Sequence, residues 1–275
     1  MRRLTLLITC AAALWCGSEA TAQGLIWNLP EDGAWVRYEG TYQQVIRRPQ
    51  SNEGDETLNW LRNLEIKSVG GEEATHDLDH DGNDVTEPCR WLEFKVTTGT
   101  NVEGTLDVGP GAAVIYKVLV PASALDGTLA DDEGIFKAYL PVVKGFRKLG
   151  DEPAQPLTSE AFHIYPNLSL LRHYRELETT ASEQSVQVPN VGTVSASVIR
   201  GRTDTETGTQ RSKNEAELVI STDMPFGLVS WKAKTATEQK NLVDPRSTFQ
   251  ESVVLSEDLK AVASGSGAES ELVTE

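Results

Sequence analysis

The stretch AWVRYEGTYQQVI, Ala34 to Ile46, alternates apolar and polar residues over most of its length. One set of alternate positions begins with Val36 and Tyr38, and the other begins with Arg37 and Glu39. Because successive side chains of a β-strand point to opposite faces of a sheet, this alternation predicts a strand with one apolar and one polar face. Such a strand is typical of an antiparallel sheet that meets water on one side.

The same period of two recurs along the chain. The stretch LNWLRNLEI places Leu58, Trp60 and Leu64 on one face, interrupted by Arg62, and RWLEFKV repeats the scheme. Weaker versions, separated by glycine, proline and acidic clusters, occur in TVSASVIRG, AELVIST, FGLVSWKAKT and TFQESVVL. The run GAAVIYKVLVP is continuously apolar and predicts a buried strand.

Two segments predict helices. PVVKGFRKL begins with Pro141, carries basic residues near its end and stops at Gly150, which is the order of proline and glycine typical of a helix. NLSLLRHYREL, Asn167 to Leu177, has a capping asparagine followed by leucines at helical spacing. The predicted fold class is therefore strand-rich α+β: a long, curved antiparallel sheet, half-barrel-like, with one or two helices packed on its concave face.

The first residues are typical of an export signal. Arg2 and Arg3 precede the apolar run LTLLITCAAALWC, and Ala20-Thr21-Ala22 supplies the small residues that a signal peptidase recognises, which predicts cleavage after residue 22. No later segment approaches the roughly 18 consecutive apolar residues of a spanning helix. We therefore expect an exported protein, periplasmic or extracellular, with no transmembrane segment after cleavage. A retained membrane anchor and a lipoprotein are the alternatives.

The expected organisation has three parts: a signal peptide at 1–22, a single strand-rich α+β domain at 23–255 and a tail at 256–275. The tail is poor in large apolar residues and rich in Ser, Gly and Glu, so it is expected to be disordered. Cleavage leaves Cys89 as the one cysteine, so no internal disulfide is expected. We interpret Cys89 as a half-buried small apolar residue rather than a reactive thiol.

The chain is acidic, with a formal net charge of -16. The signal peptide carries Arg2, Arg3 and Glu19, so its removal leaves a charge of about -17. Such a surface repels a phosphate backbone, and no Lys/Arg-rich run with interleaved aromatics is present, which excludes nucleic acid as a partner. Anionic membrane surfaces are disfavoured for the same reason. Cations, neutral apolar ligands and basic partners remain, and the plain alternative is that the charge serves solubility.

The stretch DLDHDGND, Asp77 to Asp84, places carboxylates at positions 1, 3 and 5 of a loop and a glycine at position 6. This pattern resembles the first half of an EF-hand-type calcium loop, but position 12 is Pro88 instead of glutamate, and the flanking segments predict strands. Two interpretations stay open, a weak calcium site with a structural role and an acidic loop that stays in water. A transition metal on His76 and His80 is a further alternative. The candidate calcium ligands are Asp77, Asp79, Asp81, Asn83 and Glu87.

The familiar catalytic motifs are missing from the sequence: it contains no G-x-S-x-G, H-E-x-x-H, G-x-G-x-x-G or phosphate-loop pattern. His163 and His173 have Ser159 and Glu160 nearby, but a Ser–His–acid site is defined by geometry. We therefore predict a protein that is not an enzyme and that carries no cofactor other than the calcium considered above.

One stretch resembles a known family. In AELVISTDMPFGLVSWKAKT, residues 216–235, a strand, a turn ending in Met224-Pro225 and a second strand are similar to the later strands of exported bacterial proteins of the LolA/LolB-like lipoprotein-carrier superfamily. The resemblance implies a half-barrel sheet whose concave apolar side is plugged by helices and binds acyl chains in some members. It carries over no ligand residue, and the acidic insertion at 70–88 and the tail have no counterpart in it.

The leading functional hypothesis is an exported non-enzymatic protein whose curved sheet presents a hydrophobic groove to a lipid-like ligand or a partner segment. A wide sheet with one apolar face must cover that face, and any uncovered part becomes a groove. The alternatives are a structural or adhesive envelope protein with a weak calcium-binding hairpin loop, and a hydrolase on an unrecognised scaffold. The residues expected to line the groove are Tyr38, Tyr42, Trp60, Leu92 and Phe94.

Overall fold

A computed structural model of the chain describes residues 25–49, 52–78, 82–109, 112–126, 140–159, 161–162 and 178–273. The long strands are β1 (Trp35–Ile46), β2 (Glu56–His76), β3 (Val85–Val102), β5 (Val114–Pro121), β10 (Glu178–Val188), β11 (Gly192–Glu206), β12 (Gln210–Ile220), β13 (Leu228–Gln239) and β14 (Gln250–Gly265). The short elements are β4 (Thr105–Asp107), α1 (Ala122–Asp126), β6 (Leu140–Pro141), β7 (Lys144–Leu149), β8 (Gln155–Pro156), β9 (Ala161–Phe162) and the single turns η3 (Pro225–Gly227) and η4 (Arg246–Thr248).

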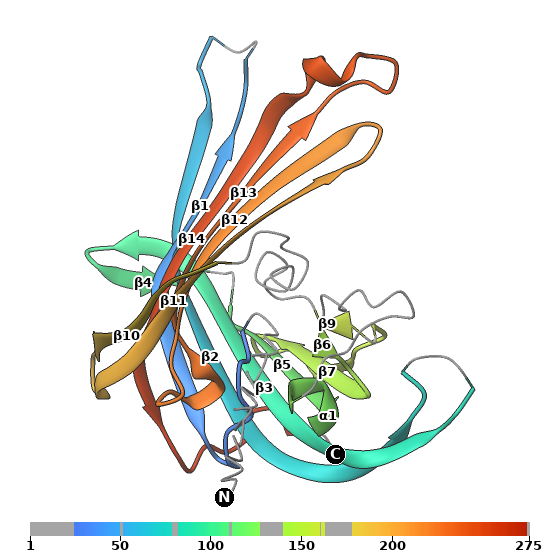
Figure 1. Ribbon diagram of the computed structural model, residues 1–275, viewed down its shortest axis with the longest axis vertical. Coiled ribbons are helices and arrows are strands. Elements are labelled where there is room, and N and C mark those ends of the chain that lie inside the picture. The colour runs from blue at the N-terminus through green and yellow to red at the C-terminus, as the bar shows by residue number, and fades with distance from the viewer. Residues whose placement is uncertain are drawn as a thin grey trace, which may run out of the picture.

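Within these residues, twelve strands form one open antiparallel sheet, and β6 and β9 pair separately (Figure 1). The order across the large sheet is β10-β11-β12-β13-β14-β1-β2-β3-β5-β7-β8, and β4 pairs with β3 alone. The strand-rich antiparallel prediction is therefore confirmed. The finer expectation of a half-barrel with helices packed on its concave face stays a prediction, because α1, with five residues, is the longest described helix.

The last strand of the sheet lies at its middle. β14 pairs with β13 on one side and with β1 on the other, so that Tyr38 faces Ala261 and Tyr42 faces Glu257. Among the described residues, strand pairing therefore connects β10–β13 with β2, β3, β5, β7 and β8 only through the β1–β14 pair. The pairing of β1 with β14 thus connects the two halves of the sheet.

The alternation in β1 has the predicted consequence. Val36 and Tyr38 are fully buried, whereas Arg37 and Thr41 are exposed on the opposite side. We call the side of Tyr38 the inner face and the side of Arg37 the outer face. The core covers the inner face at the end of the sheet near η3 and α1, and its largest fully buried side chains are Trp231, Tyr38, Phe94, Phe226, Ile26, Leu64, Ile66 and Leu92.

The helix expected from Pro141 to Gly150 is wrong, because these residues form β6 and β7. A Cβ on Gly145 would lie 2.8 Å from a methyl carbon of Leu157 and 3.2 Å from one of Val118, so this glycine allows close packing between strands. Pairing of β7 with β5 outweighs the local helical signals. The second expected helix, 167–177, lies outside the described residues.

The disordered tail expected at 256–275 is also wrong for residues 256–273. Residues 256–265 belong to β14, where Leu259 and Ala261 are buried, and Leu272 is buried beyond the end of the strand. Small apolar residues alternate with polar ones in this stretch, and a central strand gains hydrogen bonds from two neighbours. That pairing offsets the ordering entropy that composition alone suggested would dominate.

Residues 266–273, the C-terminal segment, lie on the outer face of β2 and β3. The side chain of Glu93 is 0 % exposed, and its carboxylate accepts bonds from Ser270 Oγ at 2.7 Å and from the backbone N–H groups of Glu271 and Leu272 at 3.1 Å. Lys67 Nζ lies 3.6 Å from the same carboxylate. A buried carboxylate therefore fastens this segment to the sheet.

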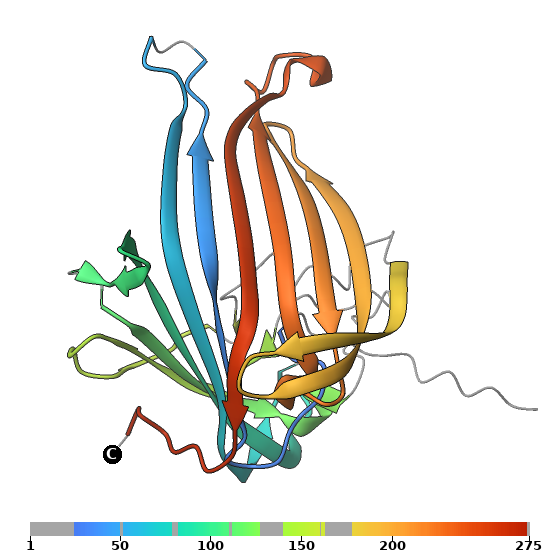
Figure 2. The ribbon, with the colours of Figure 1, turned by 90° about the vertical axis from the view of Figure 1, so that its left-hand side faces the viewer.

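Two hairpins project from the outer face, as Figure 1 shows on its left side. One is β3–β4, and the other is β10–β11, which crosses the lower ends of the neighbouring strands in Figure 2. Asn190 Nδ2, at the turn of the second hairpin, donates to the carbonyl oxygen of Val262 in β14 at 3.1 Å. Val188 of β10 and Val194 of β11, close to this turn, are buried. Among the described residues, no helix has both the length and the apolar character that crossing a membrane requires.

Candidate functional site

The inner face continues beyond the core as a band of half-buried apolar side chains, which we call the inner strip. The strip spans three neighbouring strands, because Tyr42 pairs with Trp60 of β2, and Ile46 pairs with Val253 of β14. All of its members share the inner face with Tyr38. They are Tyr42, Ile46, Leu58, Trp60, Val253 and Leu255.

One ion pair lies where the strip meets the core. Arg62 Nη1 lies 2.5 Å from Glu257 Oε1, and Arg62 Nε donates to Thr98 Oγ1 at 3.0 Å. The two charged side chains are only 17 % and 9 % exposed. The guanidinium lies 3.9 Å from the centre of the Tyr42 ring, and that ring is 5.4 Å from the Trp60 ring. A cation, two aromatic rings and a carboxylate thus form one cluster.

Burial dominates the electrostatics of this cluster. It raises the pKa of the Glu257 carboxyl above its usual range, although Arg62 and a hydrogen bond with Trp231 act in the opposite direction. Burial also raises the pKa of Tyr42. Arg62 therefore faces a carboxyl group whose charged form is disfavoured by burial. A guanidinium beside aromatic and aliphatic side chains suits an amphipathic acid.

The structure separates the five residues that were expected to line a groove. Tyr42 and Trp60 lie side by side in the inner strip, whereas Tyr38, Leu92 and Phe94 are buried in the core. Tyr38 Oη donates to the carbonyl oxygen of Leu228 at 2.8 Å, and burial raises its pKa. The prediction was therefore wrong for three of the five, because alternation identifies a face of a strand and not what covers each position along it.

Sequence reasoning did not select Arg62 or Glu257 as functional residues. A signal for Arg62 was present, since it interrupts the apolar positions of LNWLRNLEI. A charged residue at an apolar position of a half-buried strand requires a partner. Glu257 gave no comparable signal, because it lies in the stretch that composition marked as disordered.

The acidic loop is described only in part. Asp79, His80 and Asp81 lie outside the described residues, whereas Asp77 accepts a bond from the Gly82 N–H at 3.1 Å, and Glu87 pairs with His76 at 3.1 Å. The loop connects β2 with β3, so it is flanked by strands as expected. Within the described part, no three His, Cys, Asp or Glu side chains converge as a metal site would require. Calcium binding, with Asn83 as a further ligand, stays a prediction.

The structure describes Cys89 but not His163 or His173. Cys89 is buried, and burial together with the charge of Glu87 raises the pKa of its thiol, which favours the unreactive form. Glu160, His163 and His173 lie outside the described residues, so the hydrolase alternative stays a prediction.

Compared with known proteins, the chain matches no family model and no curated protein. The similarity of residues 216–235 to the lipoprotein-carrier superfamily therefore stays a resemblance, and the geometry of the inner strip has to carry any functional argument.

Proposed function

We propose that this chain is an exported, non-enzymatic binding protein that holds a lipid-like ligand on the inner face of its sheet. The observation that carries the proposal is the inner strip, in which six apolar or aromatic side chains remain half-buried beyond the packed core. An acyl chain laid along the strip would gain roughly 0.8 kcal/mol for each methylene that it buries. Export rests on the N-terminal apolar stretch and is part of the same proposal.

Arg62 gives the ligand a preferred head group. Its guanidinium lies at the core end of the strip, stacked on Tyr42 and paired with Glu257, whose charge is disfavoured by burial. A carboxylate or phosphate head would form charge-assisted hydrogen bonds with this guanidinium. The proposed ligand is therefore an amphipathic anion with a single apolar tail, such as a long-chain fatty acid.

The first test uses the intrinsic fluorescence of Trp60. Titration of the purified, detergent-free protein with a brominated long-chain fatty acid is expected to quench tryptophan emission saturably. The Trp60→Phe variant is expected to lose most of that quenching while it still binds the acid in a competition assay. Mass spectrometry of solvent extracts of the purified protein is expected to detect a fatty acid or a related lipid.

A second comparison tests the head group. The double variant Arg62→Gln, Glu257→Gln removes both charges together, because removing Arg62 alone would leave a buried carboxylate without its partner. The wild-type protein is expected to prefer the fatty acid over the matching fatty alcohol by about tenfold, and the double variant is expected to lose this preference. Absence of saturable quenching below the micelle concentration, or identical quenching after Leu255→Asn, would contradict the proposal. A partner protein segment on the strip would then be the remaining occupant.

A further inference from the structure

The outer face carries a second hollow region, on the side of the sheet opposite to the inner strip; Glu257, which pairs with Arg62, is among the residues that line it. An open groove of about 930 Å³ crosses β11, β12, β13, β14 and β1. A second hollow of about 560 Å³ lies between β1, β2 and the turn before β4. Both are lined by Thr41, so they adjoin each other at β1. We call the combined feature the outer groove.

The two projecting hairpins explain why this face is hollowed. In Figure 1 both β3–β4 and β10–β11 extend to the left of the sheet, and Figure 2 looks onto the surface between them. Leu106, in the first hairpin, lines the hollow at one end, and Glu178, at the start of β10, lines the groove at the other. The outer groove therefore extends from one hairpin to the other.

Charges in the groove alternate strand by strand. β11 contributes Arg200 and Arg202, β12 contributes Glu215 and Glu217, and β13 contributes Lys232 and Lys234. The register places opposite charges beside each other on neighbouring strands, with Arg200 facing Glu217, and Glu217 facing Lys232. The end over β1 and β2 carries fewer charges: it is lined by the neutral polar side chains of Gln43 and Asn63 together with Glu39.

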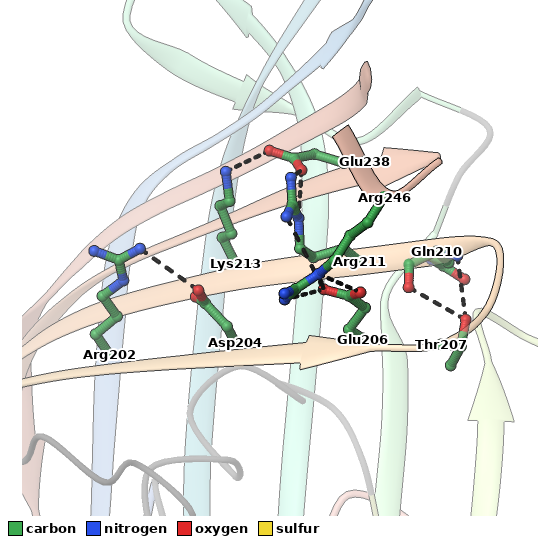
Figure 3. Close-up of polar contacts among 9 residues, drawn as sticks. All are labelled: Arg202, Asp204, Glu206, Thr207, Gln210, Arg211, Lys213, Glu238 and Arg246. Carbon is green, nitrogen blue, oxygen red and sulfur yellow. Dashed lines mark hydrogen bonds and ion pairs between the residues drawn. The ribbon is translucent and has the colours of Figure 1, made fainter. Parts of the chain in front are cut away.

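Beyond the groove, near the hairpin tips, charged side chains are compensated within the protein (Figure 3). Arg211 and Lys213 both pair with Glu238, and Arg246 forms a forked pair with Glu206 at 2.8 Å and 3.0 Å. Burial acts to raise the pKa of the Glu238 carboxyl, but Lys213 and Arg211 together outweigh it, so this pKa lies below its usual range. The network fastens β11, β12, β13 and the turn η4 to one another.

Inside the groove, Arg200 forms a close ion pair with Glu217 at 2.5 Å, with the arginine side chain 63 % exposed, whereas a second pair is looser. Lys232 lies 3.7 Å from Asp258, and the two side chains are 61 % and 41 % exposed. Glu215 and Lys234 face each other on neighbouring strands, yet neither forms an ion pair with another described residue. The groove thus presents solvated charges of both signs that a ligand can reach.

We propose that the outer groove binds an extended segment of a partner polypeptide that carries both acidic and basic residues. A polyanion would meet the carboxylates of β12, and a lipid tail would meet charged side chains on β11, β12 and β13, so neither matches the alternating charge. Neighbouring strands are roughly 4.8 Å apart, so the groove from β11 to β2 is roughly 24 Å across and accommodates about seven residues of extended chain. This site is independent of the inner strip, and absence of lipid binding would leave the proposal intact.

The test selects peptides from a displayed library of random decapeptides, with the full-length protein as target. We expect the selected peptides to be enriched in both Lys/Arg and Asp/Glu. Binding of a synthetic selected peptide is expected to weaken about tenfold when salt rises from low to high concentration, because exposed charge pairs are screened. Lys234→Glu is expected to weaken binding at least tenfold and Glu215→Lys by a similar factor, while the melting temperature stays the same.

Lys144→Glu, on the exposed surface of β7 outside the groove, changes the net charge equally and is expected to leave peptide binding unchanged. Selection of uniformly charged or apolar peptides, no enrichment at all, or equal binding by the Lys234→Glu variant would each overturn the proposal. So would salt-insensitive binding of neutral oligosaccharides in the same groove. Fatty-acid quenching measured on the same variants reports on the inner strip separately.

Discussion

At the scale of single residues, Gly40 determines how closely β1 approaches β14. A Cβ at this position would lie 1.9 Å from the carbonyl oxygen of Asp258 and 2.8 Å from the Leu259 Cα, both of which are main-chain atoms. Those atoms cannot move without disturbing the register that joins the two halves of the sheet. A glycine is therefore required here by contact with the neighbouring backbone.

Gly40→Ala is accordingly expected to lower the free energy of unfolding by about 2–4 kcal/mol, the range typical of steric conflict in a packed region. Urea denaturation followed by circular dichroism measures this change. Thr41→Ala, at the next residue with an exposed side chain, is the matched control and is expected to change stability by less than about 0.5 kcal/mol. Equal effects of the two substitutions would show that the close approach has no energetic consequence.

Glu257 predicts a particular pH dependence. Burial raises its pKa in the folded protein above the ordinary value of 4.5, so the folded state holds this proton more tightly than the unfolded state. The stabilising contribution is complete below pH 4.5 and is lost as the pH rises through the folded-state pKa. Relative to Glu257→Gln, the wild-type protein is therefore expected to lose stability as the pH is raised from 4.5 toward neutrality.

Urea denaturation of both proteins at a series of pH values measures this difference. The comparison isolates one carboxyl group, because carboxyls such as Glu206 and Asp55, whose pKa values are lowered by arginines, are present in both proteins. A constant stability difference across the series would mean that the Arg62 pair, and not burial, controls the protonation of Glu257.

The sequence predicts on which face of the sheet a side chain lies, but it does not predict which distant residues pack against that side chain. Alternation correctly placed Tyr38, Tyr42 and Trp60 on one face of the sheet. It could not distinguish Tyr38, which η3 and Trp231 cover, from Tyr42 four residues later, because that cover comes from residues nearly two hundred positions away in the chain. The pairing of Arg62 with Glu257 is hidden for the same reason.

At the scale of elements, the C-terminal segment depends on one buried acid. Glu93 accepts three hydrogen bonds from Ser270, Glu271 and Leu272, and it faces Lys67 on the neighbouring strand. Glu271 makes a different kind of contact, since its own carboxylate is 37 % exposed and pairs with Lys67 and Lys95. The C-terminal segment is thus attached to the sheet by one buried acid, Glu93 of β3, and by one exposed acid of its own, Glu271.

Glu93→Ala is expected to destabilise the protein by about 3 kcal/mol, because it leaves the backbone N–H groups of Glu271 and Leu272 and the Ser270 hydroxyl without their buried acceptor. Glu271→Ala is expected to cost less than about 1 kcal/mol, since solvent screens exposed ion pairs. Hydrogen exchange at residues 266–273 is expected to accelerate in the first variant and to change little in the second. Similar exchange in both variants would show that Leu272, not Glu93, holds the segment.

The failed helix prediction at 141–150 shows the limit of local signals at this scale. Proline first and glycine last do describe helices, but here Gly145 is needed where β7 packs against Leu157 and Val118. The competing interaction is a pairing with β5, which begins more than twenty residues earlier. Long strands such as β1 and β2 were foreseeable because their own pattern extends over many residues, whereas short strands owe their structure to partners.

At the scale of the whole molecule, the position of β14 determines which parts of the chain are needed for folding. Residues 35–46 pair with residues 253–265, so the contacts at the middle of the sheet span more than two hundred positions. In the part of the chain that the structure describes, the halves on either side have no other strand pairing between them. The two halves of the sheet are therefore connected through β14, the last strand to be synthesised.

A chain that stops at residue 249 is accordingly expected not to fold, because β1 and β13 would both lose a partner and expose unpaired edges. A chain that stops at residue 265 keeps β14 and is expected to fold with reduced stability, since it lacks only the segment held by Glu93. Amide proton NMR spectra of the two truncated proteins distinguish these outcomes. A dispersed spectrum from the shorter protein would show that each half folds independently.

The central place of β14 also bears on biosynthesis. Strand β1 emerges early during translation and has to wait until residue 265 has left the ribosome before both of its edges are occupied. Until then the complete sheet cannot form in the nascent chain, because β14 has not been synthesised. A secretory channel that threads extended polypeptide could therefore accept it without first unfolding it, which would suit the export that the N-terminal residues predict.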